Sequence, residues 1–328
     1  MQKIVCLLIF FIFVSDINAQ DVGFTQFYSN PVLLNPAMAG NTDCPTFIAN
    51  YRRQTLLANN FSTYALTADF NAKRYNSGFS LNIVKDDQGN GTVSSLQVGA
   101  DYSYRLKISN IISLKAGLET NVYQRKINYQ NLVFPDQLTP VSGVHNPTVE
   151  NIGVQNSVLY VDFAAGVVLY NKKYYFGLTV HHLTEPSHTA ASSSSDYVVL
   201  YRKYTMHAGL NFEMNKTAFD EGFLLSPALI IEQQSDFQRI SYGAYVEKNS
   251  VIGGLWVKHN LKFKFSSVAL LVGYSGDWYK IGYSYDLPFS SWGNSPNQVS
   301  AHELSLTFFP TCNLRKNSLK RAVLCPEF

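Results

Sequence analysis

Two features of this sequence have residue types that could do chemistry: a pair of histidines and a short acidic loop. His181 and His182 could bind a metal ion, but adjacent residues of a β-strand point to opposite faces, so one ion is not expected to reach both. The loop 85–91 (KDDQGNG) lacks the full acid spacing and the closing glutamate of a calcium loop, and a tight hairpin turn explains it more simply. The remaining histidines show no ligand spacing: His145, His188, His207, His259 and His302.

No serine, histidine and acid stand in an order that indicates an activated nucleophile, and serine is too common here for chance pairings to count. The sequence therefore predicts no catalytic residue, no metal and no cofactor. The net charge of +3 is too small to indicate a nucleic-acid partner.

Residues 1–19 have the pattern of a signal peptide. Lys3 precedes an unbroken apolar run, 4–14, which is too short to span a bilayer as a helix. The sequence Ile17-Asn18-Ala19 resembles a cleavage site, so the mature chain is expected to begin at Gln20. No later run reaches the roughly 18 apolar residues of a membrane helix.

The mature chain has the composition of an outer-membrane β-barrel. The full sequence has 21 tyrosines and 22 phenylalanines, whereas charged residues make up 15% of it, against about 25% in soluble domains. Apolar and small polar residues alternate, as in 279–286, where Tyr279, Ile281, Tyr283 and Tyr285 share one face. A pair of secreted β-sandwiches is the alternative, but single charges among small residues on the polar face favour a barrel with lipid outside and a polar lumen.

The alternation predicts an all-β fold: a transmembrane antiparallel β-barrel of about 14 strands over residues 46–309, in one domain. Tight links around 73–76, 108–109, 171–172 and 276 alternate with long links over 128–157, 185–200 and 288–298. Short periplasmic turns and long outer loops would place both termini in the periplasm. The predicted strands are 46–54, 61–72, 77–86, 91–107, 110–127, 158–170, 173–184, 201–215, 223–234, 237–248, 252–259, 264–275, 277–287 and 299–309.

Several charges fall on the polar face of these strands and are expected in the lumen. They could line a pore or pair with one another, and their mixed signs favour pairing. They are Asp69, Asp101, Arg105, Lys115, Glu119, Asp162, Glu213, Arg239, Glu247 and Glu303.

The stretch 20–45 precedes the first strand and is predicted to be a non-regular segment that plugs or rims the barrel. Pro31 and Pro36 push Asn30 and Asn35 out of the helical region, and Gly40 permits a positive φ. An apolar ladder follows these turns and would face water if it were not docked: Val32, Leu33, Leu34, Ala37 and Met38.

Three cysteines remain after cleavage: Cys44, Cys312 and Cys325. Closure of the barrel would bring the first strand beside the last, which favours a Cys44–Cys312 disulfide; Cys312–Cys325 or a free thiol are the alternatives. The tail 310–328 is expected in the periplasm, as a solvated basic segment or a docking segment for a partner. Its candidate contact residues are Arg315, Lys316, Arg321 and the terminal Phe328.

These motifs together resemble the PorP/SprF family of outer-membrane proteins, which belong to the type IX secretion and gliding motility machinery of Bacteroidetes. The resemblance covers nearly the whole mature chain and departs at Gln54-Thr55, where an aromatic residue is expected after the glutamine. It is carried by QFYSNP (26–31), LNPAMAG (34–40), YRRQ (51–54) with Arg52 and Arg53, VDFAAGV (161–167), YFGLTVHHL (175–183), IGYSYD (281–286), HELSL (302–306) and CPEF (325–328).

The resemblance implies a non-enzymatic barrel that supports secretion, or retains a large adhesin-like secreted protein at the cell surface. Its implied partners are outer-membrane lipid, periplasmic proteins of the secretion and gliding machinery, and that secreted protein. The lumen charges leave a channel or small-solute transporter as the alternative function.

Overall fold

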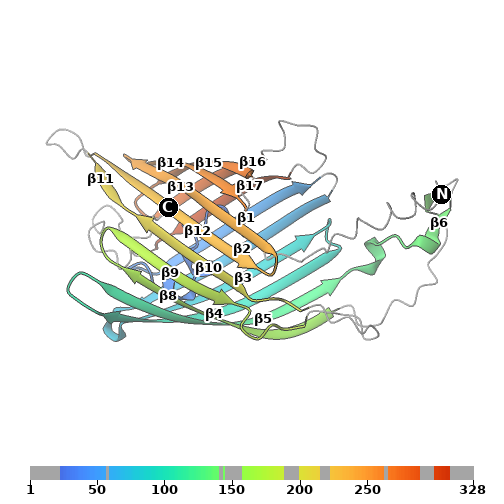
Figure 1. Cartoon of the computed structure of the whole chain (residues 1–328), viewed down its shortest axis with the longest axis horizontal. Helices are drawn as coiled ribbons and strands as arrows, with labels where there is room; N and C mark the ends of the chain where they lie inside the picture. Colours follow the sequence, from blue (N-terminus) through green and yellow to red (C-terminus); the bar gives the residue numbers. More distant parts are fainter. Residues whose placement is uncertain are drawn as a thin grey trace, which may run out of the picture.

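Strands follow one another along almost the whole chain and close into a single barrel in the computed structural model (Figure 1). The structure describes residues 23–56, 59–139, 143–144, 157–187, 199–214, 222–261, 265–288 and 299–310. Each strand pairs antiparallel with its neighbours, and the first strand pairs with the last. The predicted 14-strand antiparallel barrel is confirmed.

The strand bounds agree closely with the predicted segments. Two of them, β10 and β11, pair with the same strand β12 and flank Asn211, so they occupy one position in the barrel. The strands are β1 (Thr46–Leu56), β2 (Asn59–Ala72), β3 (Ser77–Gln88), β4 (Val93–Lys107), β5 (Ser113–Ile127), β8 (Ser157–Tyr170), β9 (Tyr174–His181), β10 (Lys203–Leu210), β11 (Phe212–Met214), β12 (Phe223–Gln234), β13 (Phe237–Lys248), β14 (Val251–His259), β15 (Phe265–Ser275), β16 (Tyr279–Pro288) and β17 (Val299–Phe308).

The prediction was wrong at several strand ends. The segment 173–184 ends as a strand at His181, because His182 and Glu185 have positive φ angles that break the extended backbone. The segment 110–127 begins only at Ser113, because Ser109 and the backbone of Ile112 form a turn before it.

The two faces of the wall differ as expected for a barrel in lipid. Outward side chains such as Leu66, Leu81 and Leu118 are exposed, whereas the inward residues between them are buried. One row of paired residues on the inner face is polar throughout: Asp69, Ser80, Asp101 and Glu119. This alternation gives lipid-facing and lumen-facing surfaces from one repeated sequence pattern.

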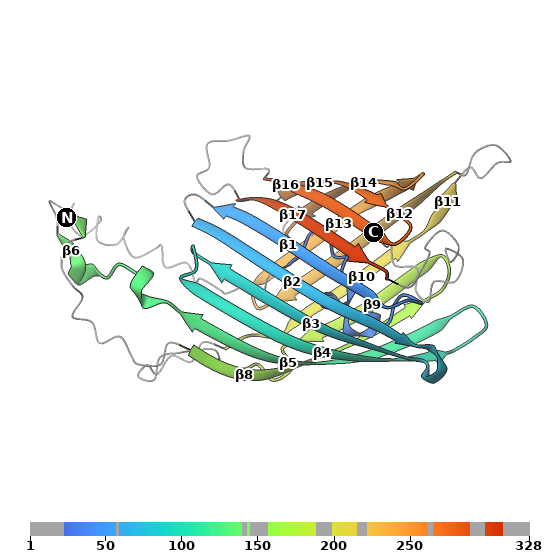
Figure 2. The same ribbon diagram turned by 180° about the vertical axis from the view of Figure 1, so that it is seen from behind.

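Residues 23–44, here called the inner segment, lie inside the barrel (Figure 2). They form two short 3-10 turns, η2 (Pro31–Leu33) and η3 (Pro36–Met38), each with proline at its first position. Gly40 has a φ of +64°, the conformation that glycine adopts without strain. No helix in the described part of the chain is long and apolar enough to cross a membrane.

The two ends of the barrel differ. At one end, which we call the turn end, short connections such as η4 (Lys73–Tyr75) join the strands. At the other, the loop end, an arm leaves β5 and projects beyond the wall through η5 (Tyr129–Asn131), η6 (Pro135–Gln137) and the hairpin β6 (Leu138–Thr139) and β7 (Gly143–Val144) (Figures 1 and 2).

Candidate functional site

The inner segment begins with a bidentate contact to a glutamate of the wall. The backbone N–H groups of Thr25 and Gln26 donate to the two carboxylate oxygens of Glu303, each at 2.7 Å. The Gln26 amide also donates to the hydroxyl of Ser284 (3.1 Å) and accepts from the hydroxyl of Ser305 (2.6 Å). Gln26 is fully buried, so these bonds replace all of its water contacts.

Glu303 belongs to a buried network of four charged groups. Arg52 bridges Glu303 and Asp286, with nitrogen–oxygen distances of 2.9 Å to each. Lys258 contacts the same Asp286 at 2.8 Å, and both cations donate to the Thr25 hydroxyl. Two cations therefore balance two carboxylates, the condition under which buried charges are tolerated. We call Thr25, Gln26 and this network the charged anchor.

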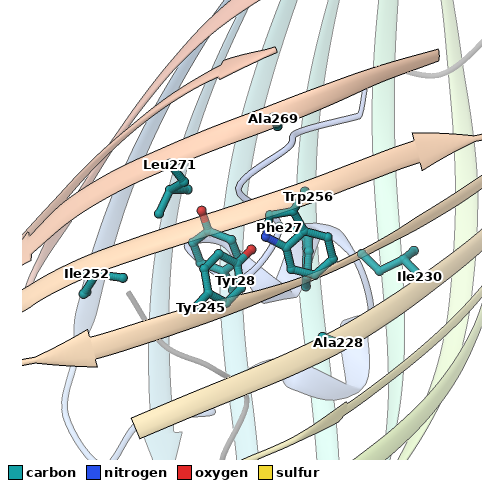
Figure 3. Packing of buried hydrophobic residues seen from close by; sticks show 9 residues of the cluster. All are labelled: Phe27, Tyr28, Ala228, Ile230, Tyr245, Ile252, Trp256, Ala269 and Leu271. Carbon is teal, nitrogen blue, oxygen red and sulfur yellow. The ribbon is translucent and has the colours of Figure 1, made fainter. Parts of the chain in front are cut away.

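Aromatic packing follows directly along the chain. Phe27 stands edge-on to Trp256 at 4.8 Å between ring centroids, and Tyr28 contacts Tyr245 at 4.0 Å. Figure 3 shows these four rings together on the inner side of the wall, with Ile230 beside them. Edge-to-face rings of this kind add stabilisation beyond the apolar area that they bury.

The two asparagines before the prolines contact different parts of the barrel wall. The Asn30 amide donates to Asn50 (3.1 Å) and Thr67 (2.9 Å) on β1 and β2. The Asn35 amide donates to the carbonyls of Val167 (3.2 Å) and Leu178 (3.3 Å) on β8 and β9, while its carbonyl caps η3 by accepting from the N–H of Ala37 (2.9 Å). Asn35 thus fixes both the local turn and its docking.

The inner segment ends at a second set of contacts, here called the backbone anchor. Asp69 accepts from the N–H groups of Gly40 (2.5 Å) and Asn41 (3.2 Å). Lys115 donates to the carbonyls of Ala39 and Gly40, and the Ser103 hydroxyl donates to Ala39. Charged side chains of the wall here bind main-chain groups of the segment.

Glycines in the wall allow the inner segment to come this close to the strands. A Cβ on Gly78 would overlap the carbonyl of Ala39, and one on Gly117 would overlap the backbone of Pro36 and Ala37. A Cβ on Gly166 would overlap the side-chain oxygen of Asn35. The wall therefore has small residues where the inner segment presses against it.

A cavity of about 230 Å³ lies beside the inner segment on the loop-end side. The segment contributes residues from Gly23 to Leu34, and nine wall strands contribute most of the remaining lining. Glu119, Tyr123 and Arg125 of β5 lie on one side, and residues of β10 and β12–β14 line it as well.

Both histidines of the pair face this cavity, so the expectation that they point to opposite faces was wrong. His181 is the last residue of β9 and points inward, 3.6 Å from Glu119 and 3.3 Å from the carbonyl of Leu34. The positive φ of His182 turns its ring inward too, to 2.6 Å from Asp162. Within the described residues no three ligand side chains are grouped to hold a metal ion.

The structure separates the predicted site residues. Arg52 enters the charged anchor, but Arg53 is exposed on the other face of β1. Asn30, Pro31, Asn35, Pro36 and Gly40 all lie in the inner segment and are buried. Arg315, Lys316, Arg321 and Phe328 lie outside the described residues.

Cys44 is disulfide-bonded and lies just before β1, whereas Cys312 and Cys325 lie outside the described residues. The pairing stays a prediction.

Of the lumen charges, Asp69, Asp101, Lys115, Glu119, Asp162 and Glu303 are buried inside the barrel, while Glu213 is exposed beyond Asn211. The sequence reasoning missed the convergence of Thr25, Lys258 and Asp286 on Arg52 and Glu303. The available signal was that Asp286 and Lys258 are isolated charges on polar strand faces.

Three outer-membrane barrels resemble the structure only distantly: the β domain of the Bordetella autotransporter BrkA (12% identity, 81% of this chain, 98% of that chain, TM-score 0.37), the Pseudomonas putida toluene transporter TodX (9%, 85%, 92%, 0.45) and a mutant of the Rh. blastica porin (6%, 80%, 98%, 0.33). No curated protein matches the chain.

A family model described as "Type IX secretion system membrane protein PorP/SprF" matches residues 17–308. The match includes every described strand and the whole inner segment, so the residues of both anchors fall within it. The chain is therefore a β-barrel of the outer membrane, and it belongs to the PorP/SprF family of the type IX secretion system.

Proposed function

We propose that this protein is a closed, non-enzymatic barrel that supports the secretion or surface retention of a large partner protein, in the gliding and secretion machinery of a Bacteroidetes cell. The observation that carries the proposal is the inner segment, which is hydrogen-bonded to β17, to β2 and to β8 inside the barrel. An open pore has no need of a segment bonded to strands this far apart in the wall, whereas a docking platform gains a rigid base from it.

The proposed orientation places the turn end and both chain termini in the periplasm, and the loop end outside. The support is the difference between the ends, because barrels of this class carry short periplasmic turns and longer outer loops. The basic tail, 310–328, would then be available to machinery proteins in the periplasm.

The arm at the loop end is the proposed contact for the secreted, adhesin-like partner. It carries three exposed apolar side chains, Leu132, Val133 and Leu138, with exposed fractions of 38%, 54% and 55%. The arm projects beyond the wall, so these side chains do not face the membrane-spanning part of the barrel (Figure 1). Apolar residues of this kind are typical of the centre of a protein interface.

The partner role is tested with one triple variant at the loop end and one single variant at the turn end. We expect L132D/V133D/L138D to abolish co-purification of the secreted partner from native membranes, while Ile111→Asp leaves it unchanged. Ile111 is a matched control because it is an exposed apolar residue, 74% accessible, at the turn end. Loss of the partner with the control alone would contradict both the contact and the orientation.

Conductance measurements distinguish the alternative function, a channel for small solutes, from a closed barrel. Wild-type protein in planar bilayers is expected to show no steady open pore, and deletion of 20–40 is expected to open one or to abolish secretion. A large stable conductance in the wild type, or a deletion that changes neither property, would contradict the closed barrel.

A further inference from the structure

The lipid-facing side of the barrel changes character from row to row. On β17, β1–β5 and β8, which lie side by side in Figure 2, residues paired across the strands form rows that run round the wall. One outward row, here called the apolar row, is apolar on every one of these strands. Its large members are exposed: Leu306, Leu66, Ile83, Val98, Val122 and Val161. Side chains of this kind face the hydrocarbon of the bilayer.

The next outward row toward the loop end carries tyrosines. Tyr51 is paired with Tyr64, with 5.0 Å between the ring centroids, and Tyr283 belongs to the same row through Leu304. Lys85 continues the row on β3 as the cross-strand partner of Tyr64. Tyrosines are enriched where a barrel surface passes from the hydrocarbon to the lipid headgroups. This row therefore marks the membrane boundary at the loop end.

One row further toward the loop end, the same face is polar on every strand from β17 to β5. The members of this polar row are His302, Arg53, Ser62, Asp87, Ser94 and Lys126. The polar row lies four residues along the strands from the apolar row, a distance of about 13 Å. It is therefore at the depth of the headgroups in the leaflet at the loop end.

The charges of the polar row do not cancel. Its acid, Asp87, is already paired with Lys85 of the tyrosine row at 3.0 Å. Arg53 and Lys126 are exposed, and neither makes an ion pair within the part of the chain that the structure describes. Two full positive charges are therefore left facing the lipid.

The two arginines of β1 have different surroundings. Arg52 points into the barrel and is neutralised in the charged anchor, whereas Arg53 points outward to the membrane. Its cross-strand neighbour His302 is held by a 2.7 Å hydrogen bond between its Nδ1 atom and the Tyr283 hydroxyl. Lipid phosphates are the anions present at headgroup depth on this face. Arginine suits them, because its planar guanidinium donates two parallel hydrogen bonds to one phosphate.

The spacing of the two cations indicates a broad headgroup. Arg53 on β1 and Lys126 on β5 are four strand spacings apart, which is about 19 Å. A phospholipid has one phosphate on a narrow headgroup, so it contacts only one of these cations. A glycolipid with a phosphorylated sugar headgroup is wider. The hydroxyls of Ser62 and Ser94, which lie between the cations in the row, can hydrogen-bond to sugar hydroxyls.

We propose that the polar row is a binding site for the phosphorylated sugar headgroup of a glycolipid in the outer leaflet, with Arg53 and Lys126 as its cationic contacts. The acyl chains of the same molecule lie along the apolar row, so both rows contribute to binding. The site rests on the rows alone, whereas the choice of the outer leaflet rests on the proposed orientation of the barrel.

The test measures lipid binding to the folded, full-length mature protein in detergent. The protein is titrated with lipid A, a phosphorylated glucosamine-disaccharide lipid, and bound lipid is counted by native mass spectrometry. Wild type is expected to bind lipid A more tightly than the same lipid stripped of its phosphates. In R53Q/K126Q we expect the dissociation constant for lipid A to rise at least about tenfold, because two cations at headgroup depth are lost. Each variant is first checked for the heat-dependent gel migration of a folded barrel, and R53Q alone replaces the double variant if the double fails to fold.

R74Q/K107Q is the matched control, because it removes one exposed arginine and one exposed lysine at the turn end. Its dissociation constant is expected to equal that of wild type, and a rise as large as in R53Q/K126Q would show general charge attraction in place of a site. Equal affinities for lipid A with and without phosphates, or for wild type and R53Q/K126Q, would overturn the site and leave the proposed orientation untouched. Phosphatidylglycerol that binds more tightly than lipid A would overturn the glycolipid and count against the orientation as well.

Discussion

The two ends of the inner segment are held to the wall by different chemistry. At the charged anchor, Arg52, Lys258, Asp286 and Glu303 already satisfy one another, and the segment adds two N–H donors and a hydroxyl. At the backbone anchor, Asp69 and Lys115 bind main-chain amides and carbonyls. Side chains of the segment itself contribute at the first end and hardly at the second.

This difference indicates what each anchor depends on. The charged anchor depends on the charge balance of four side chains from four strands. One substitution there therefore leaves a buried charge without its partner. The backbone anchor depends on how closely two main chains approach, so it is sensitive to volume in the wall. Substitutions can therefore break either anchor alone.

The largest effect is expected from Arg52→Ala. The change leaves Asp286 with one cation and Glu303 with none, and loss of one partner of a buried ion pair typically costs about 3–5 kcal/mol. The measurement is the urea concentration at the midpoint of unfolding of the purified protein. Arg53→Ala is the control, because Arg53 is the exposed neighbour on the same strand. Similar midpoints for the two variants would show that the charged anchor does not hold the segment.

A smaller effect is expected from Cys44→Ser, which removes a covalent link next to the backbone anchor and leaves the charged anchor intact. Cys44 follows that anchor and precedes β1, and loss of a disulfide generally costs about 2–4 kcal/mol. Since β1 pairs with β17, Cys312 is the predicted partner. Non-reducing peptide mapping decides the pairing: a Cys44–Cys325 peptide would reject the Cys44–Cys312 disulfide, although Cys44 would still be covalently linked.

The backbone anchor is tested next by enlarging a residue of the wall beside it. In Gly78→Ala the new methyl group meets the carbonyl of Ala39, so the segment must shift, at a cost of about 1–3 kcal/mol. Gly253→Ala is the control, because a Cβ there has no neighbour within 4 Å. Urea midpoints that fall equally in both variants would attribute the loss to strand glycines in general, and not to contact with the inner segment.

Alternation along the sequence predicts the strands well because lipid and lumen impose the same two-residue period on all of them. Strand ends and local turns are less predictable. His182 shows the reason: a single positive φ after β9 reverses the direction of its side chain, and nothing in the alternation marks that residue.

The charged anchor could not be predicted from local pattern. Arg52 pairs across the strands with Glu303, which requires the register between the first and the last strand. That register follows from closure of the whole barrel. It depends on the stagger between every pair of neighbouring strands, and not on the sequence around Arg52 or Glu303 alone. The sequence showed isolated charges on polar faces, and the fold decides which of them meet.

The smallest effects are expected from the two asparagines, and their order tests how the middle of the segment is held. Asn35→Ala removes the cap of η3 and two hydrogen bonds to the carbonyls of Val167 and Leu178, for a loss of about 1–2 kcal/mol. Asn30→Ala removes two side-chain bonds and no cap, since its side chain makes no capping bond to η2, so about 1 kcal/mol is expected. Urea midpoints of the two variants give the order directly. If Asn30→Ala proves the more damaging, the junction with β1 and β2 holds the middle of the segment, and the contact with β8 and β9 is secondary.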